Sequence, residues 1–225
     1  RSICGDRISS FEIVGRSCLD IVFKHVPDTQ EPFAKQYDWM VITELSDPLD
    51  VPLDGALHGA LSTFTGGIGE FAVTLDQDKA ESWWKLRKVI SDAQKIDRVS
   101  IKHDISVPIS EIGAFFAQTD TALQRAYPGV RIVAFGHIGD GNIHYNVSMP
   151  DPQLNAELVA RGTEVNRIVY DIVARLDGSI SAEHGLGQLK HEEIRRYKSA
   201  LELELMRSIR LTLDPQGLMN PGKLI

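Results

Sequence analysis

The stretch Gly136-His137-Ile138-Gly139-Asp140-Gly141-Asn142-Ile143-His144-Tyr145-Asn146-Val147 predicts two antiparallel β-strands joined by a tight turn. Asp-Gly is a dipeptide that two-residue hairpin loops favour. With Asp140 and Gly141 as that turn, His137 faces His144 across the hairpin. Residues directly opposite in such a pair point to the same face, with Cβ atoms about 4.5 to 5.5 Å apart. The hairpin therefore predicts two imidazoles close enough to bind one divalent metal ion.

The second strand of this hairpin has one polar and one apolar face. Side chains alternate along a strand with a period of two, which puts the polar residues together on one side (Asn142, His144 and Asn146) and the apolar residues on the other (Ile143, Tyr145 and Val147). The first face suits chemistry and the second suits a core. A purely structural interpretation stays open, because strand histidines often bind backbone groups, and Gly139 and Gly141 can serve the turn alone.

The composition of the whole chain is that of a soluble globular protein. It has 225 residues, of which 43% are hydrophobic and 24% charged, enough for one large domain or two small ones. A net charge of -7 without a basic cluster argues against nucleic-acid binding. Cys4 and Cys18 have no metal-ligand spacing and favour a reducing cytoplasm. No apolar run approaches the roughly 20 residues that span a bilayer, and no signal-peptide pattern is present.

Hydrophobic periodicity predicts strands and helices in mixed order. We expect strands at 39–45, 70–75 and 98–107 and a hairpin at 130–149. We expect helices from Ser9 or Ser10 to Pro27, and at 52–64, 78–96, 108–127 and 154–176. A short apolar segment then ends at Ile180, and a polar loop at 181–188 precedes a helix that ends near residue 212. This pattern predicts an α+β fold, with one face of a mostly antiparallel sheet covered by helices.

A second unusual stretch is Ser181-Ala182-Glu183-His184-Gly185-Leu186-Gly187, where an acid and a histidine stand between small residues. Together with His137 and His144, Glu183 completes a set of two imidazoles and one carboxylate. Such a set suits zinc, iron or manganese and leaves a coordination position open for a substrate. The neighbouring His184 is a candidate general base, a role that an ordinary imidazole pKa of about 6.5 favours.

Two cations are candidates for binding an acidic substrate. Arg87 and Ser91 are four residues apart in a predicted helix and share a face, and Lys102 lies in a predicted strand. A guanidinium group binds a carboxylate through two parallel hydrogen bonds, and a lysine adds a point charge. The alternative is that both are ordinary solvated surface groups.

Three motifs in this order carry a family resemblance: residues 136–144, residues 181–187, and Asp214-Pro215-Gln216-Gly217-Leu218-Met219-Asn220-Pro221-Gly222-Lys223. From about Leu19 onward, the chain resembles the C-terminal cap domain of FAD-linked oxidases that act on D-2-hydroxy acids. This group contains D-lactate dehydrogenases, the glycolate oxidase flavin subunit and D-2-hydroxyglutarate dehydrogenases. The resemblance implies a ferredoxin-like cap domain, an antiparallel sheet flanked by helices.

The resemblance also implies a domain organisation. In the full-length enzymes an FAD-binding domain precedes this region, and the chain begins at Arg1 without a methionine, so we expect a fragment. Residues 1–27 would form a helix linking from the FAD-binding domain, and residues 28–180 the substrate domain. Residues 181–225 would form an active-site loop, a C-terminal helix and a tail that returns to the flavin domain.

The resemblance implies a role for each residue of this chain that matches a functional position of the family. His137, His144 and Glu183 match the metal ligands of the metal-dependent members, with zinc expected, and His184 matches the proposed base. The remaining matches are to substrate and cofactor contacts: Arg87, Ser91 and Lys102 to groups that bind substrate carboxylates, Asn146 to a polar substrate-side position, and Asn220 to the tail near the flavin. Threonine is common in the family where this chain has Ser91.

The resemblance implies an FAD-dependent dehydrogenase that oxidises D-2-hydroxyglutarate, D-lactate or D-malate to a 2-oxo acid by hydride transfer, and a fragment that is inactive alone. Its expected cofactors are FAD and a divalent metal. Its expected partners are the hydroxy acid, its own FAD-binding domain and an electron acceptor, and it allows a homodimer. Two alternatives stay open: a non-catalytic α+β module that binds a metal or an acidic metabolite, and a metal-dependent hydrolase. The tail at 220–223 has no hydrolytic role that we can name.

Overall fold

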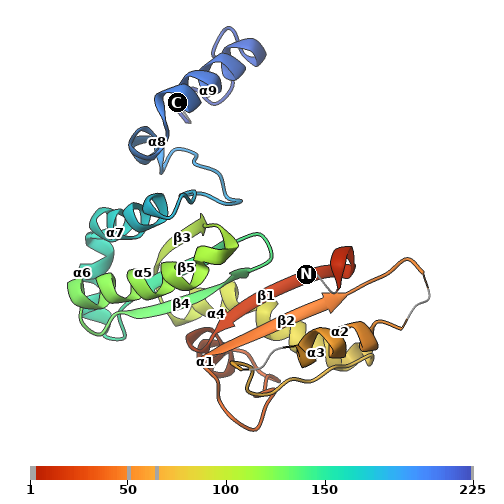
Figure 1. The fold of residues 1–225 in the computed structure, drawn as a ribbon. Helices are drawn as coiled ribbons and strands as arrows, with labels where there is room; N and C mark the ends of the chain where they lie inside the picture. Colours follow the sequence, from red (N-terminus) through yellow and green to blue (C-terminus); the bar gives the residue numbers. More distant parts are fainter. Residues whose placement is uncertain (1–3, 50–51, 64–65, 224–225) are drawn as a thin grey trace.

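The centre of the fold is a five-stranded sheet in the order β2-β1-β4-β5-β3, in which every neighbouring pair is antiparallel (Figure 1). We analysed a computed structural model that describes residues 4–49, 52–63 and 66–223. The strands are β1 (Ile8–Gly15), β2 (Trp39–Leu45), β3 (Ile101–Ser106), β4 (Arg131–His137) and β5 (Asn142–Ser148).

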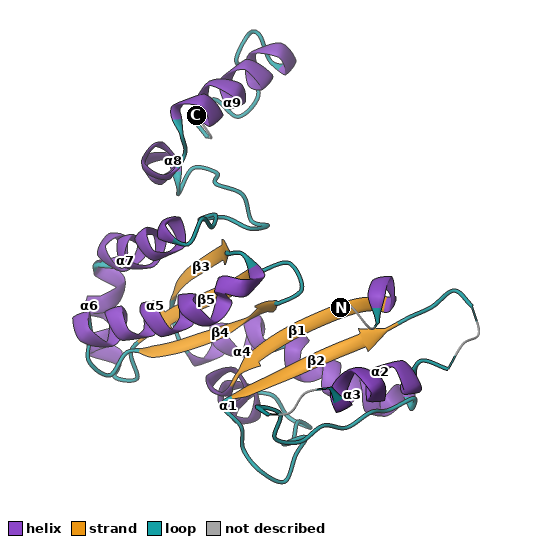
Figure 2. Cartoon of the chain, viewed as in Figure 1, coloured by secondary structure: helices purple, strands orange, loops and turns teal. Residues whose placement is uncertain are grey.

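Helices pack against both faces of this sheet (Figure 2). The helices of the described residues are α1 (Arg16–His25), α2 (Asp54–Ser62), α3 (Gln77–Lys88), α4 (Ile90–Asp97), α5 (Ile112–Ala126), α6 (Pro152–Ala160), α7 (Gly162–Arg175), α8 (His191–Tyr197) and α9 (Ala200–Leu213). Of these, α8 and α9 lie away from the sheet (Figure 2). Residues of α5, α6 and α7 form one core with Ile143, Tyr145 and Val147. Residues of α1, α3 and α4 form a second core with Val133 and Phe135. The predicted α+β class with an antiparallel sheet is confirmed, but helices cover two faces where one was expected.

The first strand corrects the prediction of a helix that starts at Ser9 or Ser10. Ile8–Gly15 is a strand between β2 and β4, and the helix begins only at Arg16. Ile13 contributes to one core and Val14 to the other, which is the alternation of a strand buried on both sides. Apolar residues at this spacing fit a helix equally well, and it is pairing with both neighbouring strands that decides the structure.

Three other predicted elements differ from the observed ones. Residues 70–75, predicted as a strand, form a largely exposed loop, and β2 remains the edge of the sheet beside β1. The predicted helices 78–96 and 154–176 are each divided in two, at Val89 (φ -89°, ψ -1°) and at Arg161 (φ -98°, ψ 22°). The last predicted helix is likewise divided, because Ser199 starts α9 with a capping box to Glu202.

The hairpin exists, but its turn is longer than predicted. In the observed register His137 pairs with Asn142 and Phe135 pairs with His144, so the turn spans residues 138–141 and the two histidines are not directly opposite. Gly141 has φ +78°, and a Cβ there would collide with the carbonyl oxygen of Val107. Val107 N–H also donates to the carbonyl oxygen of Gly141 at 3.1 Å. Contacts with the segment after β3 thus shape a turn that the Asp-Gly dipeptide alone did not specify.

The change of register does not move any side chain to the other face of the sheet. A shift of one residue would do so, whereas the observed register differs from the predicted one by two. His137 and His144 therefore remain on one face as diagonal neighbours. Within the part of the chain that is described, no helix has the length and apolar character needed to cross a bilayer.

Candidate functional site

A cavity of about 590 Å³ opens on the face of the sheet that α3 and α4 also cover. Its walls come from β1, β3, β4, β5, the two helices and the loop after Ile180. Eight of the nine residues selected from the sequence line it: Arg87, Ser91, Lys102, His137, His144, Asn146, Glu183 and His184. Segments far apart in the chain therefore meet at one place.

Each of the two hairpin histidines has a carboxylate directly opposite it on the next strand. Glu12 of β1 pairs with His137 of β4, and Asp104 of β3 pairs with His144 of β5. Both carboxylates are 3% exposed, whereas the His137 side chain is 43% exposed to the cavity. The sheet thus presents two histidines backed by two buried acids.

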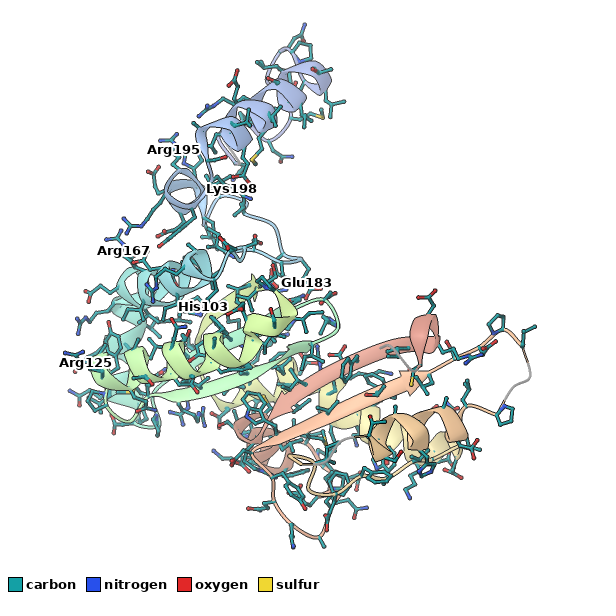
Figure 3. All side chains as sticks on the ribbon, viewed as in Figure 1. His103, Arg125, Arg167, Glu183, Arg195 and Lys198 are labelled. Atoms are coloured by element: carbon teal, nitrogen blue, oxygen red, sulfur yellow. The ribbon has the colours of Figure 1, made fainter. Side chains whose placement is uncertain are left out.

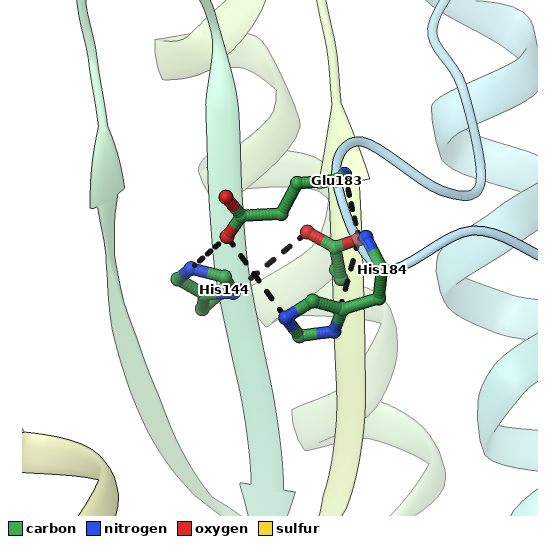
Figure 4. Close-up of side chains that lie close together, drawn as sticks. His144, Glu183 and His184 are labelled. Carbon is green, nitrogen blue, oxygen red and sulfur yellow. Dashed lines mark hydrogen bonds and ion pairs between the residues drawn. The ribbon is translucent and has the colours of Figure 1, made fainter.

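Figure 4 shows the densest group of possible metal ligands in the cavity. Ligand atoms of Asp104, His144, Glu183 and His184 all lie within 4.8 Å of one another. His144 Nε2 is 2.9 Å from Glu183 Oε1, and the His184 ring stacks on His144 with centroids 5.4 Å apart. Imidazole nitrogens and carboxylate oxygens are the donors that zinc and manganese sites use, so this group fits a divalent cation.

His137 lies beside this group and is held by a different contact. Its Nδ1 is 2.5 Å from Glu12 Oε1, and its ring centroid is 6.4 Å from that of His144. The three ligands expected from the sequence thus line one cavity, but the group whose ligand atoms lie within 4.8 Å of one another contains Asp104 and His184 and does not contain His137.

Asp104 is a residue of the site that we did not select from the sequence. Its Oδ2 accepts the backbone N–H groups of Ala182, Glu183 and His184 at 3.2, 3.0 and 2.8 Å. Burial alone would raise the pKa of Asp104, but those N–H groups and the nearby imidazoles hold it below its ordinary value. The carboxylate therefore fixes the loop of Glu183 to the edge strand β3. Glu183 on this loop is labelled in Figure 3. The same strand also carries Lys102 and His103, so nothing local in the sequence distinguished Asp104.

The environment of His144 favours its neutral form. Burial lowers the pKa of His144, and the charge of Arg87 acts in the same direction, while Glu183 and Asp104 act against them. A metal binds the neutral imidazole. Neutral His144 has a single ring N–H, and the contact with Glu183 favours that hydrogen on Nε2. A cation bound at Nε2 would therefore replace this contact.

The substrate-binding candidates come from three elements. Arg87, near the end of α3, stacks its guanidinium on Phe135 at 4.7 Å and donates from Nε to Glu12 Oε2 at 2.7 Å. Ser91 of α4 and Lys102 of β3 are exposed at the cavity. Asn146 is buried and donates from Nδ2 to Gln94 Oε1 at 2.9 Å, which fixes its amide. Arg87 and Ser91 share the cavity although they belong to two helices rather than one.

Asn220 lies outside this cavity, in the tail that follows α9. Its φ is +46°, and the tail is organised by Asp214, whose two oxygens accept the N–H groups of Leu218 and Met219. Lys223 donates to Gln188 Oε1 at 2.6 Å, which connects the tail to the end of the active-site loop. The flavin contact expected of Asn220 stays a prediction.

Comparisons with known proteins agree on one family. The family described as FAD linked oxidases, C-terminal domain, matches residues 1–224. A D-2-hydroxyglutarate dehydrogenase of Xanthomonas citri pv. viticola is 38% identical over 221 residues, which is 97% of this chain and 46% of that relative. Proteins with the same enzyme name from Stutzerimonas stutzeri and Arabidopsis thaliana, the latter mitochondrial, are 36% and 30% identical over 73% and 98% of this chain. The chain spans 36% and 38% of their lengths, so it matches less than half of each relative.

Proposed function

This chain belongs to the family of FAD linked oxidase C-terminal domains, and from that premise we propose that it is the substrate- and metal-binding part of an FAD-dependent dehydrogenase of D-2-hydroxy acids. The observation that carries the proposal is the one cavity into which imidazoles, carboxylates, cations and a hydroxyl group from β1, β3, β4, β5, α3, α4 and one loop converge. The enzyme name shared by its relatives makes D-2-hydroxyglutarate the first substrate to test.

A divalent metal, proposed as zinc, would be held by His144 and Glu183 together with His137. The donor types fit, and the buried Oδ1 of Asp104 has no hydrogen-bond partner among the described residues, which leaves a negative charge facing the site. When bound there, a metal polarises the substrate hydroxyl and lowers its pKa. FAD supplies the acceptor for the hydride from the α-carbon.

His184 is proposed as the base that takes the proton of the hydroxyl. Its Nδ1 lies 3.8 Å from Asp104 Oδ2, so that carboxylate stabilises the imidazolium that forms when Nε2 accepts the proton. The side chain is 64% exposed, which allows the proton to pass on to solvent. An imidazole at this position therefore has both a stabilising charge and an exit route for the proton.

Arg87, Ser91 and Lys102 are proposed to orient the carboxylate or carboxylates of the substrate. Arg87 comes from α3 and Lys102 from β3, so the two positive charges approach the cavity from different elements. Their contribution is positioning. Holding the α-carbon in line with the hydride acceptor lowers the activation barrier without any covalent bond between these residues and the substrate. Two separated cations suit a dicarboxylate such as D-2-hydroxyglutarate or D-malate.

The test is a substrate panel on full-length protein with bound FAD and a dye acceptor, with and without a chelator. We expect oxidation of D-2-hydroxy acids, loss of activity with the chelator and recovery with Zn²⁺. His184→Ala is expected to lower kcat by about 10² to 10⁴-fold, whereas His191→Ala, on α8 outside the cavity, serves as the matched control. Wild-type activity in His184→Ala would refute the base, and activity that survives chelation would refute the metal.

The other expectations remain proposals of the same kind. The FAD-binding domain, the electron acceptor and a homodimer are proposed partners, and the cytoplasmic location stays a prediction beside a relative that is named as mitochondrial. Membership of an FAD-linked family supports the dehydrogenase over a metal-binding sensor or a hydrolase.

A further inference from the structure

Glu12, in the middle of β1, connects two parts of the site that the proposed function treats separately. It is 3% exposed. Its Oε1 lies 2.5 Å from His137 Nδ1, and its Oε2 accepts the hydrogen bond of Arg87 Nε at 2.7 Å. One buried carboxylate therefore contacts both a candidate metal ligand and the candidate substrate-binding guanidinium.

The geometry around Glu12 is imposed by the fold. Glu12 and His137 are register partners in the antiparallel pair of β1 and β4, so their side chains leave the sheet on the same face. Arg87 is held from its other side by the ring of Phe135, 4.7 Å away. A buried carboxylate is strongly unfavourable unless it is paired, and here each oxygen has a partner, which fixes the side chain.

A carboxylate in this position restricts the imidazole to one form. An ionised carboxylate only accepts hydrogen bonds, so it favours the tautomer of His137 that carries its hydrogen on Nδ1. The lone pair is then on Nε2, on a ring that is 43% exposed at the cavity. Histidines that bind metals usually donate their other ring N–H to a carboxylate or carbonyl in this way.

We propose that Glu12 is a positioning residue, which sets the tautomer of His137 with one oxygen and the orientation of the Arg87 guanidinium with the other. The inference rests on the proposed function for what the cavity binds. The tautomer itself concerns only residues of this chain and can be measured without metal, substrate or FAD turnover.

Glu12→Gln tests this because it keeps the shape of the side chain and replaces one acceptor by a donor. Arg87 Nε requires an acceptor, so the amide oxygen turns to Arg87 and the NH₂ group faces His137. Nδ1 must then accept, the ring hydrogen moves to Nε2, and the lone pair is lost from the cavity side. Glu44→Gln on β2 makes the same change of charge at an exposed position of the neighbouring strand and is the matched control.

The measurement is ¹⁵N NMR of the histidine rings in full-length protein without metal, at a pH of about 8.5, where ordinary imidazoles are neutral. His137→Gln identifies the signals of His137. We expect an Nδ1–H form in the wild type and in Glu44→Gln, and an Nε2–H form in Glu12→Gln. Zinc affinity, measured by calorimetry, should fall by about 10 to 100-fold in Glu12→Gln. KM for D-2-hydroxyglutarate should rise because a neutral amide oxygen holds the orientation of the Arg87 guanidinium less firmly than a carboxylate does.

Two results overturn the inference: an Nε2–H form of His137 in the wild type, or the same tautomer in Glu12→Gln as in the wild type. The first decides the matter even where Glu12→Gln does not fold, which thermal melting would reveal. A failure of the proposed function gives a different result, because a wild type that binds no zinc and oxidises no hydroxy acid still reports the tautomer of His137.

Discussion

At the scale of single residues, Asp104 shows how one carboxylate serves two parts of the site. One oxygen accepts three consecutive backbone N–H groups of the loop at 182–184, and the other lies 3.8 Å from His144 Nδ1. Hydrogen bonds to a charged acceptor are stronger than those between neutral groups. The position of the loop therefore depends on the charge of Asp104 as well as on its shape.

Asp104→Asn is expected to lower the free energy of unfolding by about 1 to 3 kcal/mol, because the charge that supports these hydrogen bonds is lost. Amide hydrogen exchange at Glu183 and His184 should become faster. Urea denaturation and exchange measured by NMR check both effects. Asp92→Asn, which removes an exposed carboxylate paired with Lys95, should change stability by less than about 1 kcal/mol; equal effects in both variants would contradict the assignment.

Site residues could be predicted from the sequence where several unusual residues stand together in one motif. They could not be predicted where their role depends on pairing between strands that are distant in the chain. His144 and Glu183 come from two short motifs and meet at 2.9 Å. Glu12 is the one acid of β1 and Asp104 the one acid of β3. Each acts through a partner on another strand, which is His137 for Glu12 and His144 for Asp104, 125 and 40 residues away (137 − 12 and 144 − 104). Nothing local in the sequence identifies such a partner.

At the scale of elements, the hairpin of β4 and β5 depends on close approach of its backbones. A Cβ at Gly136 would collide with the backbone of Asn142 and Ile143 on the facing strand. Gly139 in the same motif has room, since a Cβ there would make only ordinary contact with Phe11. The glycines of this motif therefore have different roles, and only some of them are required by packing.

Gly136→Ala is expected to reduce the free energy of unfolding by about 1 to 3 kcal/mol, because the strands must separate to admit the methyl group. The same separation moves His137 relative to His144, so zinc affinity should fall as well. Gly139→Ala is the matched variant within the motif and should stay within about 1 kcal/mol of the wild type. Denaturant titration and calorimetry check both effects, and equal values for Gly136→Ala and Gly139→Ala would contradict the importance of the close approach at Gly136.

Strands and helices with a strong local sequence pattern could be predicted. Those determined by pairing between distant strands could not. The strand Trp39–Leu45 has the predicted bounds. The strand Ile8–Gly15 was predicted as a helix because the apolar spacing of its residues fits both periods. Breaks at Val89 and Arg161 interrupt sequences that are periodic enough to suggest single long helices.

At the scale of the whole molecule, buried ionisable groups connect the layers. Asp97 is the last residue of α4, and its side chain is fully buried. It binds Lys24 and His25 of α1, Arg98 directly after α4, and Arg131 of β4. Burial would raise the pKa of Asp97, but the hydrogen bonds from these four side chains lower it well below its ordinary value. A carboxyl with a lowered pKa stabilises the fold above its unfolded pKa of about 3.9, and that stability is lost as the pH falls through lower values.

His103 makes the molecule sensitive to acid at a higher pH. It is 1% exposed, its Nδ1 lies 2.8 Å from the carbonyl oxygen of Tyr145, and burial lowers its pKa to about 4. As the pH falls below 6.5, His103 binds a proton in the unfolded state before it does so in the folded state. The contribution of neutral His103 to the free energy of unfolding is therefore fully present above pH 6.5 and decreases as the pH drops from 6.5 towards 4, by up to about 3 kcal/mol. His103→Gln should flatten this part of the profile in urea denaturation. Removal of the exposed His58 by His58→Gln should leave the slope unchanged, and an unchanged slope in His103→Gln would contradict the prediction.

The hydrogen bonds from the 182–184 backbone to Asp104 have a consequence for redesign. Because these bonds come from the main chain of the loop, they can form whichever side chains stand at Glu183 and His184. An engineer could exchange these two residues to alter metal preference or acid-base chemistry and still expect the loop to return to the same place. The edge of the sheet thus holds the backbone of the loop, while the reactive side chains on that loop can be exchanged.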